Sequence, residues 1–353
     1  MSIIFAILMF SVLIFVHELG HFATAKLFGV QVNEFSMFMG PAIWKKQVGE
    51  TLYAIRLIPF GGYCAMEGED EDTDNPRSFQ KAVWWKRVII LVAGSFMNLL
   101  TGIVIYCFLF LPQPQIVEPA IVEFTECCTF NTEDGLRLDD VILQIDGEKV
   151  YSNADISTLL SFSPDGVHDL LIERGGEKLR FEDFAMTHLH ENEDGTTYRH
   201  YGFAFGKAVD ANLGQRMKFV WNTCLDNIRM VRLSLQMLFT GQAGLQDMSG
   251  PVGIVSQMSE IAEQSETAKL AFLNLLSVCA FIAINLAVMN LLPIPALDGG
   301  RVVALLLTAA IERITHKKID SKYEGYIHGA GMILLLGLMA VIMFKDIFVL
   351  MKG

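Results

Sequence analysis

Four long apolar segments decide what kind of protein this sequence can form. They cover approximately residues 3–28, 88–111, 270–292 and 327–350. Each is close to the roughly 20 residues that a helix needs to cross the hydrocarbon core of a bilayer. Only 19% of the residues are charged, which is little for the surface of a soluble domain of 353 residues. The sequence therefore predicts a polytopic α-helical membrane protein with four transmembrane helices.

Basic residues in the loops predict how these helices are oriented in the cell membrane. The loop between the first two segments contains Lys45 and Lys81, and the loop between the last two contains Arg313 and Lys322. Loops rich in Lys and Arg stay in the cytoplasm, so we expect both loops there. Residues 113–218 contain twenty acidic residues against nine basic ones, and we expect them outside the cell, together with both termini. The net charge of −12 argues against a nucleic-acid partner.

The segments between the helices predict further domains. Residues 113–210 have the pattern of short strands with one helix near 153–161, which indicates an α+β domain. Residues 211–268 are helical by pattern, with Arg229 and Arg232 among apolar residues, as in an amphipathic helix at a membrane interface. The expected domains are residues 1–112 with the first two transmembrane helices, 113–210 with the external α+β domain, 211–268 with the interfacial segment and 269–353 with the last two transmembrane helices.

The first cytoplasmic loop contains a predicted membrane-associated β-hairpin. Residues 41–46 and 51–57 alternate in residue type on either side of a turn at 47–50. The run that follows at 67–74 is acidic. We interpret this run as a solvated loop rather than a metal site, because charge runs usually face water.

The sequence HELGH at residues 17–21 is the strongest chemical signal in the chain. At 3.6 residues per turn, His17 and His21 lie on one face of a helix, so both imidazoles can reach one metal ion. Glu18 is offset by one residue, which suits it to activate a water molecule rather than to bind the metal. Ionisable residues within an apolar helix are costly in lipid and usually functional. The alternative is a polar patch that packs one helix against another.

Asp298 is the candidate for a third metal ligand. A catalytic zinc usually has three protein ligands and a water, and two histidines supply only two of them. Asp298 lies in the sequence NLLPIPALDGG, where Pro293 and Pro295 interrupt the third apolar segment before it resumes at 302–311. Backbone groups freed by such a break can line a polar cavity within the membrane. The alternative is that Asp298 caps the helix that follows.

The combination of these motifs resembles one protein family. HELGH in the first segment together with N-x-x-P-x-P-x-L-D-G in a late one is similar to the site-2 protease family of intramembrane zinc metalloproteases, in particular the bacterial regulator of sigma-E protease type. Three further stretches resemble that type: GSFMN at 94–98, GPVG at 250–253 and FGGYCAMEGE after the hairpin. The resemblance implies that His17, His21 and Asp298 bind Zn2+ and that Glu18 is the general base.

The resemblance also implies where a substrate binds. Asn290 and Asn98 are expected near the substrate, although Asn98 could equally form a hydrogen bond between helices. A free edge of the hairpin, with Tyr53 and Ile55, could accept an unwound substrate segment as an additional strand. The alternative is a hairpin that only stabilises the fold. The external domain resembles a single PDZ module, which in the family binds or excludes the external parts of substrates.

The implied function is hydrolysis of peptide bonds within or near the transmembrane segments of single-span membrane proteins. Anti-sigma factors and signal-peptide remnants are the expected substrate classes. A non-catalytic membrane chaperone is a second interpretation, which the intact HELGH and LDG motifs oppose. A metal transporter is a third. It would need a polar path through the bilayer, but no charged residue lies in the second apolar segment or at 329–344.

Overall fold

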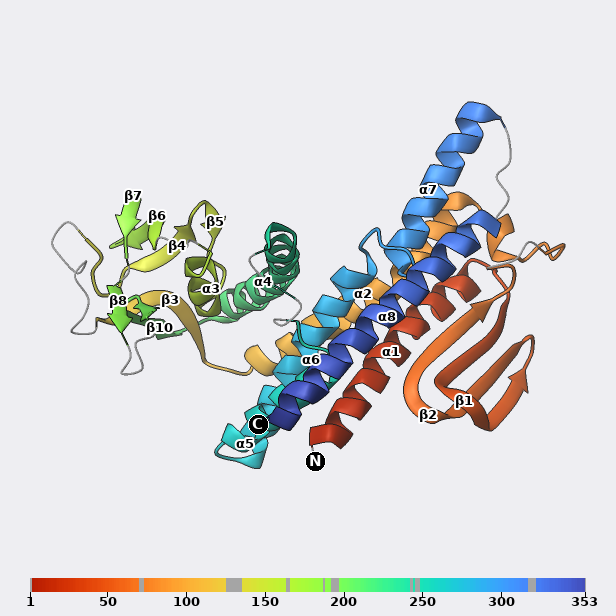
Figure 1. Ribbon diagram of the computed structural model, residues 1–353, viewed down its shortest axis with the longest axis horizontal. Coiled ribbons are helices and arrows are strands. Elements are labelled where there is room, and N and C mark those ends of the chain that lie inside the picture. Colours follow the sequence, from red (N-terminus) through yellow and green to blue (C-terminus); the bar gives the residue numbers. More distant parts are fainter. Residues whose placement is uncertain are drawn as a thin grey trace. The chain divides into compact units, whose positions relative to one another are not determined.

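The computed structural model confirms four helices that are long and apolar enough to cross a membrane. It describes residues 2–69, 73–124, 135–162, 166–186, 188–191, 197–241, 244, 248–316 and 322–352. Within these residues, the candidate spans are Ile4–Leu27, Trp84–Phe110, Ala268–Asn290 and Gly325–Val349. They belong to the helices α1 (Ser2–Leu27), α2 (Trp84–Phe110), α6 (Ala268–Asn290) and α8 (Lys322–Lys352) (Figure 1).

The chain forms two compact units. The first comprises Met1–Ile105 and Met230–Gly353, so the two ends of the sequence fold together and contain all four candidate spans except the end of α2. The second comprises Tyr106–Arg229. Helix α4 (Leu213–Thr240) belongs mostly to the second unit and continues into the first.

The predicted β-hairpin of the first unit is longer than the sequence indicates. Strand β1 covers Val32–Val48 and β2 covers Thr51–Met66, with the turn at Gly49 and Glu50 where it was predicted. Both strands bend, β1 near Gly40 (φ 84°) and β2 near Gly61 (φ 82°), where glycine tolerates the left-handed region. After the bend, the first part of β1 lies between the two parts of β2.

This bend places the predicted substrate-binding residues inside the sheet. Tyr53 pairs with both Phe35 and Lys46, and Ile55 pairs with both Met37 and Trp44. Their backbone groups face a neighbouring strand on each side, so the prediction that they form a free edge is wrong. The alternation of residues 51–57 indicates a strand but contains no information on how many strands flank it.

A shared apolar core joins the sheet to the C-terminal half of α1. The rings of Phe22 on α1 and Phe35 on β1 have centroids 4.7 Å apart, and Tyr53 lies 5.9 Å from Phe22. In Figure 1 the sheet lies beside this end of α1. Elsewhere the sheet exposes large apolar side chains, which are Met39, Ile43, Trp44, Ile55, Leu57 and Ile58. An apolar surface of this kind fits contact with lipid.

The GPVG segment begins helix α5 (Pro251–Gln264) and is fixed to the end of α8. The backbone N–H groups of Gly250 and Gly253 both donate to Asp346 Oδ2, at 2.8 and 2.9 Å. A Cβ atom at Gly250 would lie 2.9 Å from the same oxygen. Glycine is therefore required here because the carboxylate of Asp346 approaches the backbone so closely.

The second unit is an α+β domain, as predicted. Its main sheet has the strand order β10-β3-β4-β6-β7, with β5 paired to β4. The helix predicted near 153–161 is α3 (Asn153–Leu160). The strands are β3 (Gln115–Phe124), β4 (Val141–Ile145), β5 (Glu148–Lys149), β6 (Val167–Arg174), β7 (Glu177–Ala185) and β10 (Phe203–Asp210), with a separate pair β8 (His188–Glu191) and β9 (Thr197–His200).

Helix α4 is joined to this domain by buried charges. Arg229 forms ion pairs with Asp155 of α3 and with Asp226 one turn earlier on α4. Ser152 donates its hydroxyl hydrogen to Asp226 Oδ2 at 3.1 Å. Arg229 is only 8% exposed. The interpretation of Arg229 as part of a polar face at the membrane interface is therefore wrong, because its charge is neutralised inside the second unit.

Candidate metal centre

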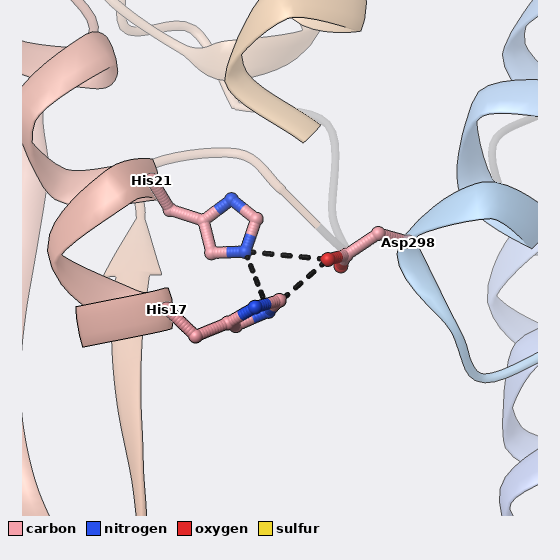
Figure 2. A group of neighbouring side chains, drawn as sticks. All are labelled: His17, His21 and Asp298. Carbon is pink, nitrogen blue, oxygen red and sulfur yellow. Dashed lines mark hydrogen bonds and ion pairs between the residues drawn. The ribbon is translucent and has the colours of Figure 1, made fainter. Parts of the chain in front are cut away.

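Two helices of the first unit bring together three side chains of the types that bind metals. His17 and His21 lie one turn apart on α1, and Asp298 is the first residue of α7 (Asp298–Thr315). The Nε2 atoms of the two histidines are 3.1 Å apart. Asp298 Oδ2 lies 3.2 Å from His17 Nε2 and 3.4 Å from His21 Nε2. Figure 2 shows the three side chains pointing at one another across the gap between the helices.

These three atoms have the spacing that a zinc ion requires. A tetrahedral zinc with bonds of about 2.0–2.1 Å separates its ligand atoms by about 3.3 Å. The three observed separations of 3.1, 3.2 and 3.4 Å all fit this value. Two imidazoles and one carboxylate are also a common ligand set for catalytic zinc, which leaves the fourth position for water or substrate.

The loop before α7 holds Asp298 in place. Helix α6 ends at Asn290, and Ala296 has a positive φ of 82° after the two prolines. A Cβ atom at Gly299 would lie 2.2 Å from the carbonyl oxygen of Leu291, so only glycine lets the loop pack against the first turn of α7. Asp298 does not cap the helix, because Leu297 occupies the N-cap position.

Helix α2 packs directly behind the two histidines. A Cβ atom at Gly94 would lie 2.4 Å from His21 Nε2 and 2.8 Å from His17 Nε2. On α1, a Cβ atom at Gly20 would lie 2.4 Å from the Ala93 carbonyl oxygen. Glycine at these two positions therefore permits the close approach of α1 and α2 and leaves room for the imidazole rings.

Helix α2 also contacts the second nitrogen of each imidazole. His21 Nδ1 lies 2.8 Å from the carbonyl oxygen of Ile90. His17 Nδ1 lies 3.3 Å from the side-chain amide nitrogen of Asn98. Asn98 is 1% exposed, so its side chain packs between the helices. The structure thus places Asn98 beside a histidine, a contact that the sequence did not indicate.

Glu18 follows His17 on α1 and lies beside the sheet. A Cβ atom at Gly62 of β2 would lie 3.7 Å from Glu18 Cγ, so the end of β2 passes close to this side chain. The sheet therefore approaches the candidate centre through Gly62 and not through Tyr53 or Ile55. Asn290, the other predicted substrate-binding residue, is the half-buried last residue of α6.

Two residues near the centre were missed by sequence reasoning. Arg301 on α7 forms an ion pair with Glu69, which follows the end of β2. The side chain of Glu69 is 17% exposed, so the interpretation of this part of the acidic run as a solvated loop is wrong. The available signal was an arginine three residues after Asp298, on the same turn of α7.

Comparison with known proteins identifies the family. A model of peptidase family M50 matches residues 5–338. The chain belongs to this family. M50 peptidases are the site-2 proteases, so the resemblance inferred from the motifs is confirmed. A protein of Clostridium perfringens named "putative zinc metalloprotease" is 35% identical over 98% of both chains. The zinc metalloprotease RasP of Oceanobacillus iheyensis is 29% identical, and the regulator of sigma-W protease RasP of Bacillus subtilis is 27% identical, each over 98% of both chains.

Membership in M50 establishes the general activity. The protein is a membrane metalloprotease that depends on zinc, as the motifs predicted. The site-2 type acts in regulated intramembrane proteolysis, and the four candidate spans fit a multi-pass protein of the cell membrane. The interpretations as a non-catalytic chaperone or a metal transporter are therefore not favoured.

Proposed function

We propose that His17, His21 and Asp298 bind the zinc of this M50 protease and that Glu18 is its general base. The observation that carries this assignment is the convergence of two Nε2 atoms and one carboxylate oxygen within 3.4 Å, from helices far apart in the sequence. Zinc, when bound, polarises the scissile carbonyl group and makes a water molecule more acidic. Glu18 takes the proton from that water and transfers it to the leaving amine nitrogen.

The proposed substrates are single-span membrane proteins cut within or next to their transmembrane segment. The name of the Bacillus subtilis relative, regulator of sigma-W protease, supports an anti-sigma factor as one substrate class, and signal-peptide remnants are another. A substrate helix hides its peptide bonds in hydrogen bonds between residues i and i+4, so it must unwind before it is cut. The unwound backbone then needs new hydrogen-bonding partners.

The end of β2 is the proposed place where the unwound substrate binds. Residues 62–66 pair with the first part of β1 on one side, and no other strand of the described residues pairs with them. Gly62 at this edge faces Glu18. A substrate segment that adds here as an extra strand would satisfy its own N–H and C=O groups and lie beside the general base. Asn290 remains a proposed substrate-binding residue.

We further propose that the second unit is an extracytoplasmic PDZ-like module that binds or excludes the external parts of substrates. The acidic balance of residues 113–218 and the sheet with one adjoining helix support this proposal. Cysteines introduced at Glu177 and at Arg313 test the orientation with an impermeant thiol reagent added to intact cells. The account predicts labelling above the wild-type level at Glu177 and none at Arg313. We also place the metal centre near the cytoplasmic side of the membrane, because His17 lies near the cytoplasmic end of the first span. The reverse labelling pattern would contradict both placements.

Substitution of Glu18 tests the proposed mechanism. A Glu18→Gln variant should bind zinc normally, retain a model single-span substrate and fail to cut it, because the amide cannot accept the proton. Glu260→Gln on α5 is the matched control, since this exposed residue lies outside the centre. Substantial cleavage by the Glu18 variant would show that another group is the base.

A further inference from the structure

The geometry points to Asn98 and the carbonyl group of Ile90 as the groups that hold His17 and His21 in the tautomer that binds metal. This inference rests on the proposed zinc site. It assigns Asn98 as a positioning residue, in place of the substrate contact or plain helix–helix hydrogen bond that the sequence suggested.

An imidazole that binds a metal presents one nitrogen without hydrogen to the metal and carries its hydrogen on the other. In both histidines, Nε2 is the atom that faces Asp298 Oδ2. The hydrogen must then be on Nδ1 in each ring. The group that contacts Nδ1 decides whether this tautomer is stable.

For His21, the group in contact with Nδ1 permits only one tautomer. Nδ1 lies 2.8 Å from the Ile90 carbonyl oxygen, and a carbonyl oxygen can only accept a hydrogen bond. His21 therefore donates from Nδ1–H and keeps Nε2 free for the metal. The peptide backbone of α2 enforces this choice, so no side-chain substitution on α2 removes it directly.

For His17 the partner is the side-chain amide of Asn98, whose two ends have nearly the same shape. The amide nitrogen lies 3.3 Å from His17 Nδ1, and the amide oxygen is buried without a hydrogen-bond partner among the described residues. Rotating the amide by half a turn exchanges these two atoms, which ordinary structures distinguish only by their hydrogen bonds. The oxygen of the rotated amide accepts from His17 Nδ1–H, and the amide nitrogen takes the buried position that the oxygen had.

The unrotated amide would have the opposite effect. Its N–H would donate to a lone pair on His17 Nδ1, which places the ring hydrogen on Nε2, where the metal binds. Only the rotated amide is compatible with zinc bound by His17. Metal binding by His17 therefore selects the rotated orientation of Asn98.

The three contacts form one stripe along α2. Ile90, Gly94 and Asn98 are spaced four residues apart and therefore lie on one face of the helix. Ile90 holds His21, Gly94 leaves room for both rings and Asn98 holds His17. This explains the G-x-x-x-N element at 94–98 as support for the metal ligands.

The zinc affinity of Asn98 variants in the purified full-length protein tests this inference. Zinc alone is the probe, titrated in competition with a chelator. Asn98→Leu keeps the volume but removes the acceptor and should weaken zinc binding roughly 10- to 100-fold. Asn98→Asp keeps an acceptor and should bind zinc at least as tightly as the wild type. Thr101→Ala is the matched control, because the hydroxyl group of Thr101 donates to the backbone carbonyl oxygen of Met97 on its own helix.

The outcomes separate this inference from the zinc site itself. If His17→Ala and Asp298→Ala lose zinc while Asn98→Leu binds it like the wild type, the site stands and the role of Asn98 is wrong. If the histidine and aspartate variants also keep zinc, the proposed site is wrong. If Asn98→Leu fails to fold, the Asn98→Asp variant provides the test. A loss of zinc affinity of tenfold or more in Asn98→Asp would overturn the inference.

Discussion

Arg301, one turn after Asp298 on α7, donates a hydrogen bond to the carboxylate of Glu69, although 232 residues separate the two in the sequence. The other oxygen of Glu69 accepts from the backbone N–H of Met66 at 3.4 Å. Val302, the next residue on α7, packs against the apolar core that the sheet shares with α1. The helix that carries Asp298 is therefore fixed to the end of β2, close to Glu18.

Breaking this ion pair should impair cleavage more than metal binding. We expect Arg301→Gln to lower the rate of cleavage of a model substrate roughly 10-fold or more. Without the ion pair, α7 with Asp298 is no longer fixed to the end of β2 with Gly62. Zinc content should remain normal, since none of the three ligands is changed. Arg313→Gln, an exposed position on the same helix, is the control. A charge exchange, Glu69→Arg with Arg301→Glu, should restore part of the rate, and no restoration would argue that the pair itself is unimportant.

Gly94→Ala should remove zinc although none of the three proposed ligand residues is replaced. The new Cβ atom would lie 2.4 Å from His21 Nε2. We expect the zinc content after dialysis against a mild chelator to fall well below that of the wild type. Gly337→Ala on α8, where a Cβ atom meets nothing within 4 Å, should keep its zinc. Full zinc and normal cleavage in the Gly94 variant would contradict the observed packing.

Gly62→Val tests where the substrate lies. The larger side chain would fill the space between β2 and Glu18, where a Cβ atom already comes within 3.7 Å of Glu18 Cγ. Cleavage should fall sharply and the apparent KM should rise, while zinc content stays normal. Gly337→Val is the control for an added side chain. Unchanged kinetics in the Gly62 variant would exclude substrate addition at this edge.

The sequence predicted that the side chains of His17, His21 and Asp298 converge better than it predicted what surrounds them, for a physical reason. His17 and His21 are one helical turn apart, so local periodicity suffices to place them on one face. The pairing of Asn98 with His17 and of Arg301 with Glu69 depends on how helices and strands pack, and no local pattern encodes it. Tyr53 illustrates the same limit, because its strand was predicted correctly but its second neighbour exists only after the bend in β1.

The second unit should lose stability as the pH rises towards neutrality. Burial, with a further contribution from Asp155, raises the pKa of Asp226 to about 7. The folded state then holds a proton that the unfolded state releases near pH 4, so stability falls between about pH 4 and pH 7, by on the order of 1 kcal/mol per pH unit. Hydrogen exchange of α3 in the full-length protein, corrected for intrinsic rates, measures this loss. Asp226→Asn should abolish the pH dependence, and an unchanged slope in that variant would assign the proton elsewhere.

The zinc environment of the purified protein tests the central proposal most directly. X-ray absorption at the zinc edge should show zinc bound by two imidazole nitrogens and by oxygen ligands at about 2.0–2.1 Å. The Asp298→Ala variant should lose most of its zinc after dialysis against a mild chelator. An unchanged zinc content and spectrum in that variant would show that the metal binds elsewhere in the chain.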